Sequence, residues 1–195
     1  MRPISTERFF AWASKRGIEL DERYPDARCL TYKPYRDFSR FWELPGNPAT
    51  WPHLIASCLK AMDRWSAGYL WPRLGHWPVE GKAGDYNEGV RDVVLRGAAI
   101  PSGLAGAVHF RRKEEDALLS VIFIYLAFGW FLGDDLYFIP DHGRQFLLTS
   151  HHDVIHISCA EGKRVRVFVK YMAKAGYELP TAVPDDTFKR PSWMK

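Results

Sequence analysis

The chain has little cysteine and no closely spaced cysteine pair. Its 195 residues include three cysteines, Cys29, Cys58 and Cys159. An odd number of distant thiols excludes a zinc ribbon and does not fit a disulfide framework. The N-terminal stretch also has no apolar segment of signal-peptide length. We therefore expect a cytoplasmic protein with reduced thiols.

The sequence also lacks a strong charge of either sign. Its formal net charge is +4, from 27 Lys and Arg against 23 Asp and Glu. Dedicated nucleic-acid binders concentrate more basic residues on one element, so nucleic acid is not the expected partner. A small basic excess indicates only a mild preference for acidic partners.

No apolar run is long enough to predict a membrane span. The stretch from Ala117 to Gly133 is uncharged, but a span needs about 20 residues and acidic residues flank this one closely. With 47% hydrophobic residues the chain can bury a large core, which excludes general disorder. The stretch is therefore interpreted as a buried core element, and no membrane partner is expected.

Motifs that carry well-known chemistry are missing as well. The sequence contains no GxSxG, HExxH, P-loop or GxGxxG pattern. No enzyme class is indicated by a motif, and we expect no cofactor.

The pattern of apolar residues predicts an α+β fold. Helices are expected from Ser5 to Gly17, from Trp51 to Trp65, over 117–128 and over 161–175, because apolar residues recur at helical spacing or caps and stop signals frame the segment. Strands are expected near 28–33 and 38–44. Three short runs, 135–140, 145–149 and 154–159, predict an antiparallel C-terminal meander packed against the helices. Residues 1–195 form one domain in this interpretation, with 1–112 and 113–195 as possible lobes.

The most concentrated polar motif is 149-TSHHDVIH-156, with three of the seven histidines. In one continuous strand His152 and His156 would lie roughly 13 Å apart. That is too far for both to bind one ion at Zn–N distances of about 2.0–2.1 Å. A three-histidine metal site therefore requires the chain to turn.

A hairpin turn supplies such a geometry. If His151 and His152 are its central pair, Thr149 pairs with Val154, and His156 lies on the strand behind the turn. A polar turn with a hydrogen-bonded histidine is the simpler interpretation of this segment.

The alternative is a functional Asp/His cluster made from two turns. His151, His152 and Asp153 would meet Asp141 and His142 from the preceding turn, either around a metal ion or as catalytic acid and base. The acidic pair at 134–135 together with Asp141, or the pair at 185–186, could bind a divalent cation, although Asp pairs beside turns mostly serve as caps and turn formers.

Two segments are candidates for partner binding. In 69–78 the tryptophans are not explained by a helical core, and a proline-rich segment is not expected to bury them. We predict an exposed recognition element there, because Trp, Tyr and Arg are typical binding anchors. Its candidate contact residues are Tyr69, Trp71, Arg73, His76 and Trp77.

The last helix carries the second candidate surface. Beside its apolar stripe a basic row recurs at helical spacing, with no acidic residue between Glu161 and Glu178. Such a row suits phosphate or an acidic protein surface, and a solvated helix face is the alternative. The row consists of Lys163, Arg166, Lys170 and Lys174.

The C-terminal half contains a further set of short motifs. They are Gly129-Trp130, Asp134-Asp135, the 140–143 turn, His151-His152-Asp153 and Pro184-Asp185. Over residues 129–186 the chain resembles small, poorly characterised bacterial proteins of the polymorphic-toxin immunity type. The resemblance implies a protein that binds and neutralises a cognate toxin without catalysis. The basic balance departs from inhibitors of nuclease toxins, which tend to be acidic, so a toxin of another class is implied.

These observations leave three hypotheses. The first is a protein-binding module without catalysis, of the immunity type that the resemblance implies. The alternative is a metal-dependent enzyme built on the Asp/His turns. The third is a binder of nucleic acid or of another acidic partner through the last helix. The sequence does not indicate an oligomeric state.

Overall fold

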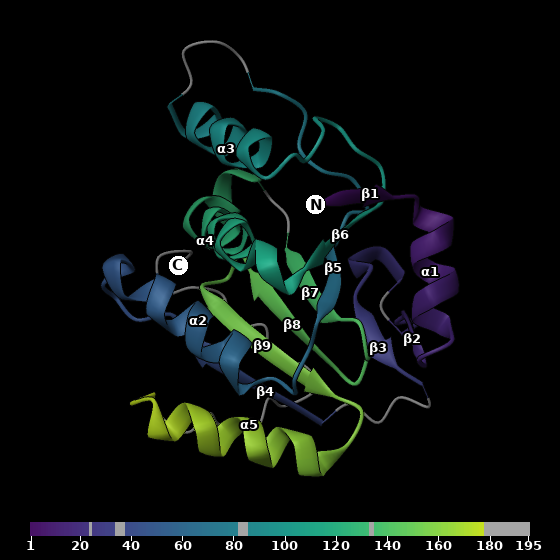
Figure 1. Ribbon diagram of the computed structural model, residues 1–195, viewed down its shortest axis with the longest axis vertical. Coiled ribbons are helices and arrows are strands. Elements are labelled where there is room, and N and C mark those ends of the chain that lie inside the picture. Colours follow the sequence, from purple (N-terminus) through teal and green to yellow (C-terminus); the bar gives the residue numbers. More distant parts are fainter. Residues whose placement is uncertain (24, 34–37, 82–85, 133–134, 178–195) are drawn as a thin grey trace.

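The computed structural model describes residues 1–23, 25–33, 38–81, 86–132 and 135–177, and it confirms an α+β fold (Figure 1). The strands are β1 Arg2–Ile4, β2 Ile18–Leu20, β3 Leu30–Tyr32, β4 Phe38–Glu43, β5 Ala67–Pro72, β6 Ala107–Arg111, β7 Leu136–Pro140, β8 Gln145–Ser150 and β9 Val154–Cys159. The helices are α1 Thr6–Ser14, α2 Trp51–Ala61, α3 Tyr86–Gly97, α4 Glu115–Leu132 and α5 Gly162–Lys174.

The centre of the fold is a seven-stranded antiparallel sheet. Its strand order is β1-β6-β5-β7-β8-β9-β4, and β2 pairs with β3 in a separate two-stranded sheet. The predicted meander is confirmed as β7, β8 and β9 at adjacent positions. Strands from both sides of residue 112 belong to this one sheet, because β5 pairs with β7 and β4 pairs with β9.

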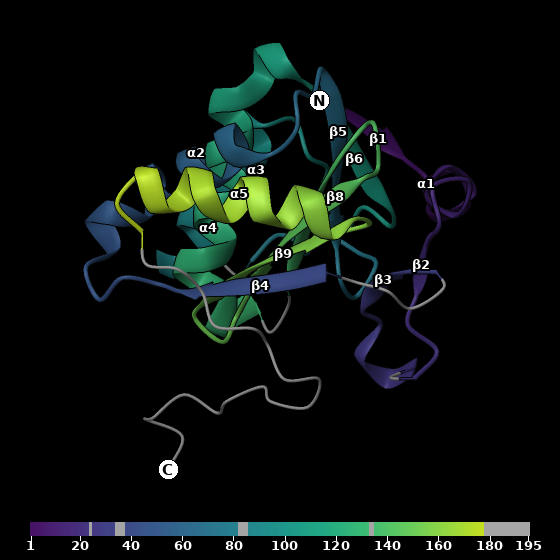
Figure 2. The same cartoon turned by 90° about the horizontal axis from the view of Figure 1, so that it is seen from below.

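The two faces of the sheet are covered differently. Helices α2, α3, α4 and α5 lie on one side, while α1 and the β2–β3 pair lie on the other (Figure 2). Alternate residues of each strand therefore enter two separate cores. In β5, Leu70 packs with the four helices, whereas its neighbour Trp71 packs with α1.

Most of the predicted elements are present. The apolar run at 117–128 is a helix, α4, and its acidic first turn of Glu115 and Asp116 is typical of a helix start. Ser5 caps α1 by accepting a hydrogen bond from the backbone N–H of Arg8. The strands that the sequence did not predict are short, with three residues each in β1 and β2 and five in β6.

Candidate functional site

The histidine hairpin has a different register from the expected one. Ser150, not Thr149, pairs with Val154, so the turn contains three residues, His151 to Asp153. Asp153 adopts a φ of 60°, a left-handed conformation that aspartate tolerates and that a three-residue hairpin requires. The predicted two-residue turn is therefore wrong by one position.

The two Asp/His turns also do not meet. The turn with Asp141 and His142 precedes β8, and the turn with His151 to Asp153 follows it. Since β8 has six residues at about 3.4 Å each, its ends lie roughly 17 Å apart. In the ranges that the structure describes, no group of three His, Cys, Asp or Glu side chains is placed to hold a metal ion. The two-turn metal and catalytic clusters are therefore not assembled; Asp134 and the pair at 185–186 lie outside the described residues.

The partner of His151 is Asp135, the residue directly before β7. Asp135 is only 3% exposed, and its Oδ1 accepts the backbone N–H of His151 at 2.9 Å and lies 2.6 Å from the ring Nδ1. On the other side, Nε of Arg73 lies 3.1 Å from Oδ2. Burial acts to raise the pKa of Asp135, but the His151 hydrogen bonds and the Arg73 charge outweigh it and lower this pKa. An ionised carboxylate thus joins the hairpin to the end of β5.

The other two histidines of the motif lie close to this carboxylate. The rings of His151 and His152 are 4.0 Å apart between centroids, and His156 lies 5.9 Å from the ring of Phe41. Burial lowers the pKa of His156 to about 4, with Asp135 opposing the shift, and burial also lowers the pKa of His152. Both rings are therefore neutral at neutral pH.

Among the described residues, this arrangement contains no activated nucleophile. Cys29 shares the electrostatic surroundings of Arg73 and Asp135, but burial raises the pKa of its thiol. A protonated thiol is a poor nucleophile. The cluster is best explained as a structural clamp, in which the hydrogen bonds of Asp135 to His151 and its ion pair with Arg73 hold the hairpin against the end of β5.

The predicted recognition element at 69–78 is not exposed. Trp71 and Trp77 are both 0% exposed. Trp71 stacks on Phe9 of α1 with ring centroids 4.5 Å apart, and Trp77 makes an edge contact with Tyr125 of α4. The prediction was wrong because Pro72 ends a central strand, which has a covering layer on each face.

The remaining residues of that segment are divided among different surroundings. Tyr69 is half-buried against Trp12, with ring centroids 4.2 Å apart. Arg73 is engaged with Asp135, and only the side chain of His76 is exposed. The segment therefore does not form a single docking surface.

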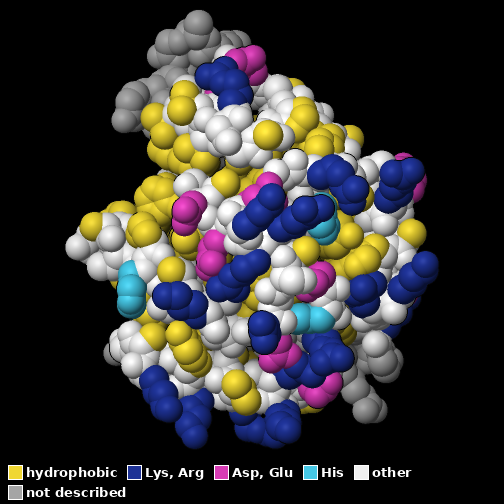
Figure 3. Space-filling model, in the orientation of Figure 1, with side chains coloured by type: hydrophobic (Ala, Val, Ile, Leu, Met, Phe, Trp, Pro, Cys, Tyr) yellow, Lys and Arg dark blue, Asp and Glu magenta, His cyan; other side chains and the backbone are white. Residues whose placement is uncertain are grey.

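The basic row of α5 is exposed, as its sequence spacing predicts. All four side chains, Lys163, Arg166, Lys170 and Lys174, point away from the core. Figure 3 shows a group of Lys and Arg side chains along the lower edge of the molecule, where α5 is found in Figure 1. Two apolar side chains share this outward surface, Val167 at 55% and Tyr171 at 39% exposed.

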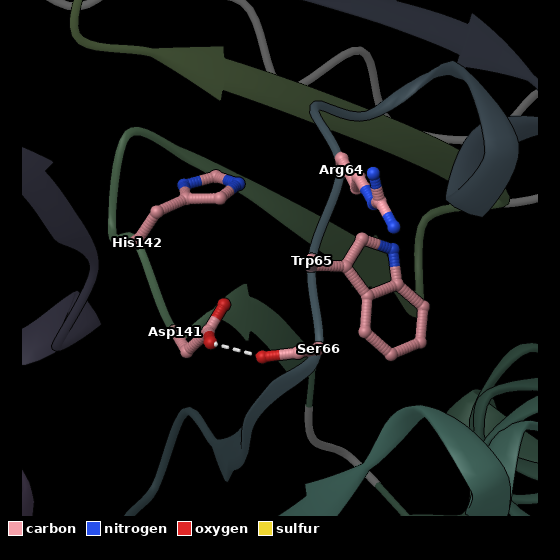
Figure 4. A pocket seen from close by; sticks show the side chains of 5 residues that line it. All are labelled: Arg64, Trp65, Ser66, Asp141 and His142. Atoms are coloured by element: carbon pink, nitrogen blue, oxygen red, sulfur yellow. Dashed lines mark hydrogen bonds between the residues drawn. The ribbon is translucent and has the colours of Figure 1, made fainter.

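A hollow near the Asp141-His142 turn brings together residues that sequence reasoning did not connect. Its volume is about 370 Å³, and it is lined by Arg64, Trp65, Ser66, Asp141 and His142 (Figure 4). A second hollow of about 590 Å³ shares the 64–66 segment and adds Lys60 and Arg112. Neither Arg64 nor Ser66 belongs to a recognisable motif, so only the fold could place them opposite this turn.

Comparisons with protein-family models, with curated proteins and with solved structures find no match to this chain. Within the described part of the chain, no helix has both the length and the apolar character needed to cross a membrane.

Proposed function

We propose that this chain is a protein-binding module without catalysis and that it docks an acidic protein partner on the outward surface of α5. The observation that carries the proposal is the exposed basic row on this helix, which no acidic residue interrupts between Glu161 and Glu178. A row of like charges on one face attracts an oppositely charged surface and accelerates association with it.

The helix that carries the row is held firmly. Val165, Phe168 and Met172 are buried beneath it, and an ion pair joins Arg164 to Asp63 at the end of α2. Its last turn ends with Gly176 at a φ of 91°. Little backbone freedom is therefore lost when the exposed side is covered, which favours binding.

The apolar side chains between the cations favour a protein partner over a nucleic acid. Val167 and Tyr171 follow each other by one helical turn, and Phe38 of the edge strand β4, 43% exposed, lies against Gly162 at the start of α5. Phosphate backbones are bound by cations and polar groups and gain little from such apolar contacts. Protein interfaces combine an aromatic or apolar centre with a charged rim.

The toxin remains a separate prediction. The resemblance over 129–186 implies a toxin as the partner, but the α5 proposal rests on charge and exposure alone. Part of the resemblance, including Pro184-Asp185, lies outside the described residues.

The proposal is tested by capture with a photo-crosslinking amino acid at Tyr171, followed by identification of the captured protein and a binding measurement with the purified pair. We expect the captured protein to be acidic. Its affinity for this chain should fall at least about 10-fold when Arg166 and Lys170 are both replaced by Glu, because each lost charge contact costs about 1 kcal/mol or more. The matched control is Arg8→Glu with Lys15→Glu, two exposed cations on α1 and at its C-cap. Capture of nucleic acid, or equal loss of affinity in both double variants, would contradict the proposal.

A further inference from the structure

Helices α2 and α5 lie side by side and run in opposite directions. Near the start of α2, Nδ1 of His53 lies 2.6 Å from the hydroxyl oxygen of Tyr177, which follows α5. At the other end, Arg164 in the first turn of α5 forms an ion pair with Asp63, just after α2. Figures 1 and 2 both show the two helices next to each other. The outward surface of α5 therefore continues onto α2.

The two exposed apolar side chains of α5 lie on the side of the helix that faces α2. Arg164 marks this side, because it pairs with Asp63. Tyr171 follows Arg164 by seven residues, two helical turns, so the two side chains point in nearly the same direction. Val167 precedes Tyr171 by four residues, a spacing of about 6 Å along one helix face. Val167 and Tyr171 thus form a short apolar strip beside the line where α2 and α5 meet.

Basic side chains border this apolar strip on both sides. The basic row of α5 lies on the side of the strip away from α2, and Lys60 is exposed on α2 itself. Figure 3 shows hydrophobic side chains between two groups of Lys and Arg side chains, where α2 and α5 are found in Figure 1.

No acidic residue within the two helices offsets this positive charge. Neither Trp51–Ala61 nor Gly162–Lys174 contains Asp or Glu. The two acidic residues where these helices meet, Asp63 and Glu161, both pair with Arg164. An apolar centre with positive charge on two sides therefore favours a ligand that is apolar in its middle and acidic on both flanks.

An amphipathic α-helix has this distribution of side chains. Its apolar residues recur at i, i+3, i+4 and i+7, so they form one stripe with polar residues on either side. An extended segment turns every second side chain away from the surface, and a nucleic-acid duplex makes little use of an apolar strip. Binding of an amphipathic helix by its apolar stripe is a recurring mode of peptide recognition.

We propose that the partner binds with an acidic amphipathic helix that lies along both α2 and α5. Its apolar stripe covers Val167 and Tyr171, and its acidic flanks reach the basic row on one side and Lys60 on the other. This inference rests on the proposed function of the α5 surface, and it adds α2 to the interface and a conformation to the bound segment.

The inference is tested with two synthetic peptides of identical composition, made of Glu, Leu and Ala. Each has about 18 residues, enough to form a helix. In the first peptide the leucines recur at helical spacing, and in the second they occupy every second position. We expect the helical peptide to bind the intact chain with a Kd of about 100 μM or lower, at least about 10-fold tighter than the alternating peptide. Because both peptides carry the same charge, electrostatic attraction alone predicts equal affinity.

Variants of the chain test the two parts of the interface separately. Val167→Ala with Tyr171→Ala should weaken binding of the helical peptide at least about 10-fold, and Lys60→Glu at least about 5-fold. The matched controls are Val93→Ala, at a valine 61% exposed on α3, and Lys15→Glu beside α1, which should leave the affinity unchanged. NMR of the ¹⁵N-labelled chain should show amide shifts on both α2 and α5.

Several results would overturn the inference. Equal affinity for the two peptides would do so, as would unchanged affinity of Lys60→Glu with amide shifts confined to α5. The proposed function still stands in these cases if Arg166→Glu with Lys170→Glu weakens binding. If neither peptide binds at millimolar concentrations, or if that double variant binds like the wild type, the proposed function fails as well. Tighter binding of a DNA duplex than of the helical peptide, or a homodimer that buries α2 and α5, would assign the surface to a different occupant and also overturn the inference.

Discussion

Protonation of His156 should destabilise the folded protein between neutral and mildly acidic pH. Its pKa is lowered from 6.5 to about 4 by burial in the folded state, whereas in the unfolded chain the ring is exposed to water. The folded state therefore binds this proton less readily than the unfolded state. The stabilising contribution is fully present above pH 6.5 and is lost as the pH falls toward 4.

The expected magnitude follows from the size of the shift. The complete loss of unfolding free energy is about 3.5 kcal/mol, at about 1.4 kcal/mol per pKa unit. Proton linkage predicts that the free energy of unfolding falls by about 1.2 kcal/mol between about pH 7 and pH 5.5, and by about 2.4 kcal/mol by about pH 4.5. Native domains are stabilised by only about 5–15 kcal/mol, so this loss is readily measured.

The assay is urea unfolding at these three pH values for the wild-type protein and for His156→Gln, which cannot titrate there. The variant can be less stable at neutral pH, so the informative quantity is the slope of unfolding free energy against pH. Contributions from Asp135 and His152, which act electrostatically on His156, are present in both proteins. The matched control is His76→Gln, at an exposed histidine.

We expect the wild-type protein and the His76 variant to lose stability in parallel, and the His156 variant to lose about 1 kcal/mol less by about pH 5.5. Parallel loss in all three proteins would refute the reasoning, because it would mean that His156 titrates equally in the folded and unfolded states.

Three further substitutions test the packing. Asp135→Asn should cost about 3 kcal/mol in urea unfolding, because it removes the ionised carboxylate that pairs with the largely buried Arg73; a cost below about 1 kcal/mol would contradict the clamp. Trp71→Ala should cost about 3–5 kcal/mol by the same assay, whereas an exposed tryptophan would cost almost nothing. Gly106→Ala should lower the melting temperature by about 4 °C or more. The backbone there has a φ of 122°, and a Cβ would lie 2.2 Å from the carbonyl oxygen of Ile4. An unchanged melting temperature would contradict this close approach.

The elements that could be predicted are those with strong local signals. The helical spacing from Trp51 onward and the acidic start of α4 each indicate a helix without reference to the rest of the chain. β6 is harder to find, because it has only five residues. The alternation of Val108 and Phe110 with His109 and Arg111 is too short to distinguish a strand from a loop until β1 and β5 are placed beside it.

The Asp135–His151 pair could have been predicted from the meander alone. Leu136 pairs with Thr149, so the residue before β7 and the residues after β8 must lie at the same edge of the sheet. The sequence interpretation instead joined two consecutive turns, which a meander always places at opposite ends of their shared strand. The burial of Trp71 needed more information, because it depends on α1 covering the second face of β5.

The strand order has a consequence for how the chain is made. β4 has one neighbour in the sheet, β9, and Phe38 pairs with Cys159. β5 likewise needs β7 on one side. When the ribosome has synthesised only the first half of the chain, β4 and β5 therefore lack their pairing strands β9 and β7. The sheet cannot form until these strands have emerged. Because such distant pairings are slow to form, we expect the nascent chain to depend on chaperones to shield its apolar strands until β9 has emerged.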